Sequence, residues 1–147
     1  WAALASNAPI LPEVMPEECK TAGVVLCVDK AHRKLSFVKN GSVVKAIPIR
    51  VGGWNTEPKT GKWRVFSTVS GTWRVFDKKV NPPSDNYGSG AMPYSVMFQE
   101  GMYVHYSSGF ASVGYAQSSH GCVNVASLAD AKWFYANTPV GAKVFVF

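Results

Sequence analysis

Residues 119–124 read Ser-His-Gly-Cys-Val-Asn, and this stretch decides how the rest of the chain is interpreted. In an extended backbone, residues i and i+2 project to the same side, so the side chains of His120 and Cys122 should point together. Gly121 between them carries no Cβ and lets a substrate approach the main chain closely. An imidazole beside a thiol is the usual means of generating a thiolate near neutral pH, so the stretch predicts a nucleophilic cysteine.

A second imidazole lies upstream, where Tyr103-Val104-His105 reads as the end of an apolar strand. His105, His120 and Cys122 are all residue types that bind zinc. A zinc enzyme would also need a nearby carboxylate as general base, yet Glu100 is the only charged residue between positions 88 and 129. The chain also contains no Cys-x-x-Cys or His-Glu-x-x-His pair. We therefore expect no metal site.

Two other interpretations of the cysteine are less favoured. A papain-like protease would place its cysteine near the N-terminus and its histidine far downstream, whereas here His105 comes first and is close. A plain buried thiol is the ordinary role of a single cysteine. Two histidines beside Cys122 favour a nucleophile instead.

The composition is that of a folded domain. The chain has 147 residues, of which 47% are hydrophobic and 16% charged, which is enough for one domain with a core. No apolar run approaches 18 residues, so we expect no membrane span. Separately, we expect the protein to be a monomer. The chain begins at Trp1 without Met or signal peptide, as a trimmed secreted protein or a shortened chain would.

The net charge of +6 gives a pI near 9.3. Most of the basic residues are spread from Lys20 to Lys79 without an Arg-rich run or a nucleic-acid-binding motif, so nucleic acid is not the expected partner. A bacterial wall, with its carboxylates and phosphates, suits a basic secreted protein better. A basic surface that is merely solvated is the alternative.

The chain has three cysteines, of which Cys19 and Cys27 lie close together near its start and Cys122 lies in the motif. Cys19 and Cys27 could form a disulfide that tethers the N-terminal segment to the first strand, worth about 2–3 kcal/mol in the chain-entropy model. The alternative is two buried thiols. The odd cysteine, Cys122, is a candidate reactive thiol in an oxidising compartment.

Short β-branched and aromatic runs bounded by turn residues predict a mainly β, sandwich-like or barrel-like domain. The predicted strands cover residues 24–28, 35–38, 42–51, 63–69, 72–76, 94–99, 102–106 and 143–147. Asn40-Gly41 is a strong hairpin signal, and the repeated Trp-Arg-Val-Phe at 63 and 73 suggests that these two strands pair. One main helix is expected from the N-cap Ser127 to the Asn137-Thr138-Pro139 stop.

Three segments are expected to be irregular. Residues 1–21 read as an extended arm, which leaves 22–147 as the domain, and residues 107–118 read as a loop of small residues. Residues 78–93, rich in Pro and Gly, read as a mobile flap beside the site, in which Tyr87 and Met92 are best suited to cover a bound substrate. A surface excursion without a role is the alternative.

His105 and the 119–124 motif, thirteen residues apart, resemble the signature of the L,D-transpeptidase (YkuD) catalytic domain. Three further segments strengthen the resemblance, which covers about residues 22–147. They are Thr60-Gly61, preceded by Lys59 where the family commonly has Pro, then Met92-Pro93-Tyr94 and the helix over 130–138.

The resemblance implies a role for each site residue. Cys122 would be the nucleophile and His105 the base, with His120 as the second candidate. The backbone carbonyl of Tyr106 would orient the base. The N–H groups of Gly121 and Cys122 are candidates for an oxyanion hole.

Other residues would have supporting roles. Ser119 and Asn124 would hold the motif loop in place. Tyr94 and Phe110 could line the groove for the acyl donor, although either could equally belong to the core.

The resemblance also implies the reaction. The enzyme would release D-Ala from a peptidoglycan stem tetrapeptide, hold the stem as a thioester, and pass it to a side-chain amine of a second stem, forming a 3→3 cross-link. Water as acceptor would make it an L,D-carboxypeptidase. No cofactor is needed, the location would be the bacterial cell envelope, and carbapenems would be inhibitors. A wall-binding module without catalysis and a structural β-domain are the alternatives.

Overall fold

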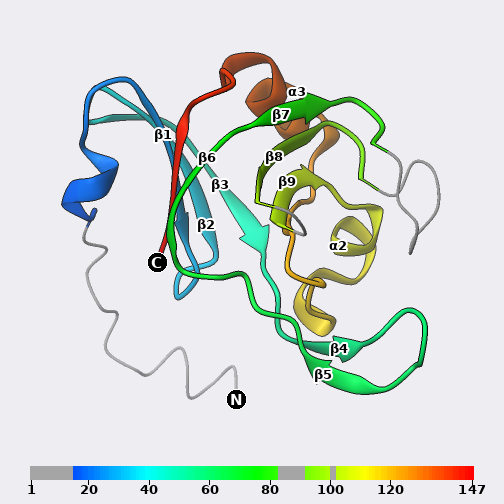
Figure 1. The fold of residues 1–147 in the computed structure, drawn as a ribbon. Helices are drawn as coiled ribbons and strands as arrows, with labels where there is room; N and C mark the ends of the chain where they lie inside the picture. Colours follow the sequence, from blue (N-terminus) through cyan, green and yellow to red (C-terminus); the bar gives the residue numbers. More distant parts are fainter. Residues whose placement is uncertain (1–14, 83–91, 100–101) are drawn as a thin grey trace, which may run out of the picture.

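The computed structural model describes residues 15–82, 92–99 and 102–147 (Figure 1). These residues form a nine-stranded sheet in the order β6-β11-β1-β2-β3-β10-β9-β8-β7 and a separate β4–β5 hairpin. The strands are β1 (Val24–Asp29), β2 (Lys34–Lys39), β3 (Ser42–Arg50), β4 (Trp54–Thr56), β5 (Trp63–Val65), β6 (Gly71–Arg74), β7 (Asp77–Lys79), β8 (Ser95–Gln99), β9 (Met102–Tyr106), β10 (Val123–Val125) and β11 (Lys143–Val146). The sheet curls into a half-barrel, which confirms the predicted mainly β fold.

The arrangement of three neighbouring strands positions the site. β10 pairs in parallel with β9, where Asn124 lies opposite His105, and antiparallel with β3, where Asn124 lies opposite Arg50. Residues opposite one another in a sheet project from the same face. Arg50, Asn124 and His105 therefore stand in a row across three strands that are far apart in the sequence.

The core lies between the curled sheet and helix α3 (Leu128–Asn137). Ser127 caps this helix as predicted, since its hydroxyl accepts a hydrogen bond from the Asp130 N–H at 3.2 Å. Phe134 is fully buried, and Phe37 of β2 meets it edge-on with ring centroids 6.1 Å apart. α3 contacts β8, β9 and β10, and so backs the strands that carry the site.

The Asn40-Gly41 turn joins β2 and β3 as predicted. Both residues have positive φ, 50° and 82°, which the type I′ hairpin turn requires and which Asn and Gly tolerate best. The pairing predicted for residues 63–69 and 72–76 is wrong. β5 pairs with β4, whereas β6 pairs with β11.

The two Trp-Arg-Val-Phe copies differ because only one of them reaches the core. Trp73 of β6 packs against the main core cluster, and Val75 after it is buried. Trp63 of β5 is 58% exposed and stacks on Trp54 of β4 at 5.9 Å. Burial of the second copy therefore favours the edge of the main sheet over a local hairpin.

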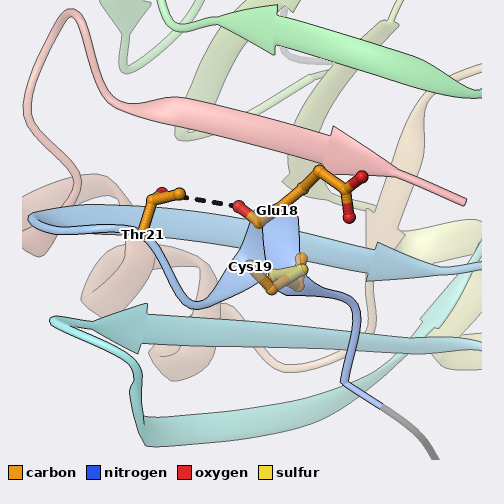
Figure 2. Close-up of a disulfide and its surroundings, with 4 residues drawn as sticks. Glu18, Cys19 and Thr21 are labelled. Atoms are coloured by element: carbon orange, nitrogen blue, oxygen red, sulfur yellow. Dashed lines mark hydrogen bonds between the residues drawn. A yellow bond between two sulfur atoms is a disulfide. The ribbon is translucent and has the colours of Figure 1, made fainter.

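A disulfide joins Cys19, at the end of the 3-10 helix η1 (Glu17–Cys19), to Cys27 of β1, as predicted. Figure 2 shows this bond beside the turn in which the Thr21 hydroxyl donates to the Glu18 carbonyl. Both cysteines belong to a small second core cluster. Cys122 is outside the disulfide and keeps its thiol.

All three segments expected to be irregular contain some regular structure, since the 3-10 helix η1 lies in the expected arm. Residues 108–113 form helix α2 (Ser108–Val113), capped by the Ser107 hydroxyl, followed by the 3-10 helix η2 (Gly114–Ala116). Sequence reasoning missed α2 because its small residues carry little periodic signal. The first residues of the expected flap belong to β7, whereas positions 83–91 lie outside the described residues, as do 1–14 of the expected arm.

None of the described helices is long and apolar enough to cross a membrane.

Candidate active site

A cavity of about 270 Å³ opens where β3, β9, β10 and α2 meet. No acidic side chain of the described residues lines it, and Arg50 is the arginine among its lining residues. The lining residues are Arg50, Met92, His105, Ser107, Ser108, Gly109, Ser119, His120, Cys122 and Asn124. The structure thus brings together most of the residues that the sequence singled out.

His105 lies near the end of β9, with its side chain buried. Its Nδ1 is 2.6 Å from the carbonyl oxygen of Tyr106. A carbonyl can only accept, so Nδ1 carries the proton and Nε2 has the lone pair. The Nε2 atom in turn lies 3.3 Å from the amide nitrogen of Asn124.

Burial lowers the pKa of His105 to about 4. The hydrogen bond to Tyr106 acts in the opposite direction, and the positive charge of Arg50 lowers the pKa further. At neutral pH His105 is therefore an uncharged imidazole, which is the form that can accept a proton.

Cys122 is partly buried at the start of the segment that becomes β10. Burial raises the pKa of its thiol to about 11, and a backbone hydrogen bond with Tyr103 works in the opposite direction. The resting pair is thus a thiol and a neutral imidazole.

The motif loop is held by hydroxyl groups. The Ser119 hydroxyl donates to the Cys122 carbonyl at 2.6 Å and accepts from the Gly121 N–H at 3.2 Å. Thr68 donates to the Gly121 carbonyl at 2.8 Å. Gly121 has a φ of 107°, which side-chain-bearing residues rarely adopt, so this position needs glycine. An oxyanion role for the Gly121 N–H would require its bond to Ser119 to break.

His120 is anchored away from the strands of the site. Its Nε2 lies 2.7 Å from the carbonyl oxygen of Thr56 in β4, and its ring meets Phe66 edge-on at 4.7 Å. Asn55 ties the same hairpin to the loop by donating to the Ser118 carbonyl at 2.8 Å. His120 therefore couples the motif loop to the β4–β5 hairpin.

The residues expected to contact substrate are placed differently from one another. Met92 lines the cavity, whereas Tyr94 packs edge-on against Tyr135 at 5.6 Å and Phe110 is buried. Neither Tyr94 nor Phe110 is among the lining residues. Tyr87 lies outside the described residues.

Arg50 is the charged lining residue that the sequence did not reveal; Ser107, Ser108 and Gly109 of the lining were not singled out either. Arg50 ends β3 and is 9% exposed. Its Nε donates to Asn124 Oδ1 at 2.9 Å, and its two terminal nitrogens donate to the Gln117 carbonyl at 3.2 Å and to Ser107 Oγ at 3.3 Å. Arg50 and Asn124 are 74 positions apart, and only the sheet topology joins them.

In the part of the chain that the structure describes, no group of three or more His, Cys, Asp or Glu side chains is arranged to hold a metal ion.

A family model described as the L,D-transpeptidase catalytic domain (YkuD) matches residues 23–146. An L,D-transpeptidase from Stackebrandtia nassauensis is similar in structure, with a TM-score of 0.69 and 28% identity over 85% of this chain and 55% of that one. An L,D-transpeptidase from Xylanimonas cellulosilytica has a TM-score of 0.72 and 27% identity, over 99% of this chain and 68% of that one. An L,D-transpeptidase from Mycobacterium smegmatis has a TM-score of 0.62 and 27% identity, over 86% of this chain and 59% of that one. The present chain thus spans between about half and two thirds of these chains. A comparison with curated proteins gives no match.

Proposed function

Because the chain belongs to the L,D-transpeptidase catalytic domain family, we propose that it is a peptidoglycan L,D-transpeptidase with Cys122 as its nucleophile. The observation that carries the proposal is the placement of His105. Its Nδ1 is tied to the Tyr106 carbonyl, its Nε2 keeps the lone pair and contacts the Asn124 amide, and its side chain lines the same cavity as Cys122. A base oriented by a third group beside a nucleophile is the arrangement that acyl transfer uses.

The first half of the reaction forms a thioester. Once Nε2 of His105 gives up its contact with the Asn124 amide, it takes the proton from the Cys122 thiol as sulfur attacks the carbonyl carbon of the diamino acid in a stem tetrapeptide. The C–N bond to the terminal D-Ala breaks, and His105 returns the proton to the leaving amine. Backbone N–H groups of the motif loop are the candidates to stabilise the oxyanion.

The second half consumes the thioester. A side-chain amine of a second stem attacks the same carbonyl, loses a proton to His105, and releases Cys122 as the thiol. The product is a 3→3 cross-link, and no cofactor enters either half. If water attacks instead, the product is a tripeptide and the protein acts as an L,D-carboxypeptidase.

The same proposal covers location and partner. The family acts on peptidoglycan, and the disulfide suits an oxidising compartment outside the cytoplasm. The net charge of +6 favours association with an anionic wall polymer. We therefore place the protein in the bacterial cell envelope, with peptidoglycan stem peptides as its substrates.

The test is incubation with a disaccharide tetrapeptide, followed by mass spectrometry of products and protein. The proposal expects a dimer with a 3→3 link, released D-Ala, and a thioester on Cys122. Tripeptide alone would identify a carboxypeptidase. Absence of any thioester would leave the wall-binding module as the better description. A carbapenem is a second probe, since one L,D-transpeptidase of this fold was solved with imipenem.

A further inference from the structure

We propose that Arg50 is the receptor for the terminal carboxylate of the acyl donor, which is the carboxylate of the D-Ala that leaves. The inference rests on the proposed function for the identity of the donor. It rests on the structure for the guanidinium, which lies in the cavity that holds Cys122 and His105.

The first observation is that Arg50 is held rigidly. Its three hydrogen bonds go to Asn124, Gln117 and Ser107, and the Phe110 ring lies 5.6 Å from the guanidinium carbon. A guanidinium fixed in this way loses little conformational entropy when it binds a ligand.

The second observation is that these partners are all neutral. The described residues provide Arg50 with no ion pair, although it is more than nine-tenths buried. Buried charges in proteins are normally paired, because burial without a counter-charge is costly. Three of the five guanidinium N–H groups are used, and the other two have no partner in the described residues. An anion bound in the cavity would supply both the missing charge and the missing acceptors.

The third observation identifies which anion fits. His105 must return a proton to the leaving amine, so the leaving residue has to lie beside His105. In a terminal D-Ala the carboxylate is attached to the carbon that carries that amine. Arg50 is separated from His105 by a single side chain, that of Asn124, which contacts both. The terminal carboxylate therefore falls on the Arg50 side of the scissile bond.

Binding of the carboxylate would also help the base. Arg50 is one cause of the low pKa of His105. A bound carboxylate compensates that positive charge, so the imidazole accepts the thiol proton more easily once the correct donor is present. Arg50 would then couple recognition of the donor to activation of Cys122.

The experiment compares two donors, a stem tetrapeptide with a terminal carboxylate and the same peptide with a terminal carboxamide. Calorimetric titration of the Cys122→Ala protein measures binding without turnover. We expect the acid to bind about 10- to 100-fold more tightly than the amide, the range for hydrogen bonds to a charged group. Arg50→Gln in the same background should remove the preference and Arg50→Lys should retain part of it. Arg74→Gln, at an exposed arginine of β6, should leave it unchanged.

Equal binding of acid and amide to the Cys122→Ala protein overturns the proposal, and this arm needs no change at Arg50. A preference that survives Arg50→Gln also overturns it. If the Arg50→Gln protein does not fold, the acid and the amide are compared on the Arg50→Lys protein instead. A preference for the acid that is as large as in the Cys122→Ala protein with Arg50 intact then overturns the proposal.

The proposed function is tested separately in the wild-type protein. A preference for the acid without any thioester on Cys122 would support the receptor and overturn the transpeptidase. A thioester formed at equal rates from both donors would support the transpeptidase and overturn the receptor role of Arg50.

Discussion

Asn124 lies opposite His105 in the parallel β9–β10 pair, and its side-chain nitrogen is 3.3 Å from His105 Nε2. The orientation of this amide follows from its other neighbour. Arg50 Nε can only donate, so the amide oxygen faces Arg50 and the amide N–H₂ faces the imidazole. With Nδ1 tied to the Tyr106 carbonyl, both ring nitrogens of His105 have fixed roles. The unprotonated Nε2 is the atom that a base needs.

Cys122→Ala should reduce acyl transfer at least about a thousandfold, because the nucleophile is removed. The fold should be retained, since Cys122 is outside the disulfide and only partly buried. Mass spectrometry of the protein after incubation with a tetrapeptide or imipenem measures the adduct, and thermal unfolding checks the fold. Cross-linking at near wild-type rate by the Ala protein would show that the nucleophile lies elsewhere.

His105→Gln should slow acylation by about 10²- to 10⁴-fold, the range for loss of a general base. His120→Gln should have a smaller effect, because His120 bonds to Thr56 in β4 and Gln can also donate to that carbonyl. Single-turnover acylation of both variants measures the difference. The assignment of the base reverses if His120→Gln is the more damaging change.

Asn124→Asp should raise the pKa of His105 above its value of about 4. The new carboxylate would accept a hydrogen bond from protonated Nε2 and would compensate Arg50, and both effects favour the imidazolium. An NMR titration of the His105 ring protons measures the shift. Asn137→Asp, the same change at the exposed end of α3, is the control and should leave His105 unaltered. An unchanged titration in Asn124→Asp would contradict the predicted contact.

The free energy of unfolding should rise between about pH 4 and pH 6.5. In this window the unfolded chain binds a proton at His105 and the folded protein does not, so acid favours unfolding. The contribution of His105 to the free energy of unfolding is fully present above pH 6.5 and is lost as the pH falls toward 4. The difference amounts to roughly 3 kcal/mol. His105→Gln should flatten this limb in urea unfolding measured across the window. Parallel profiles for the two proteins would show that His105 titrates normally.

Thiol titration of the denatured, non-reduced protein should find one thiol, that of Cys122. Reduction should expose two more and lower the free energy of unfolding by about 2–3 kcal/mol, because the unfolded chain regains the entropy of a small closed loop. A double Cys19→Ala, Cys27→Ala variant should match the reduced protein. Three thiols without reductant would contradict both the bond and the argument for an oxidising compartment.

Local sequence was enough for several elements and for choosing Cys122 as the candidate nucleophile. The β-branched run at 24–28, the Asn40-Gly41 turn and the Ser127 cap each act over a few residues, and each is found where it was predicted. The 119–124 motif is also local, since its serine, glycine and cysteine hold one another within a single loop.

Tertiary structure decided what lies beside the motif. The two Trp-Arg-Val-Phe copies are alike in sequence, yet only the second packs against the core. The strand partners of the two copies could therefore not be inferred from the repeat. Arg50 enters the cavity because β10 lies between β3 and β9, a consequence of strand order and not of any local preference. The sequence alone singled out Cys122 and His105 as the candidate nucleophile and base. The strand order alone determined that the Asn124 side chain connects the buried Arg50 to His105, because contacts between distant strands depend on how the whole sheet closes.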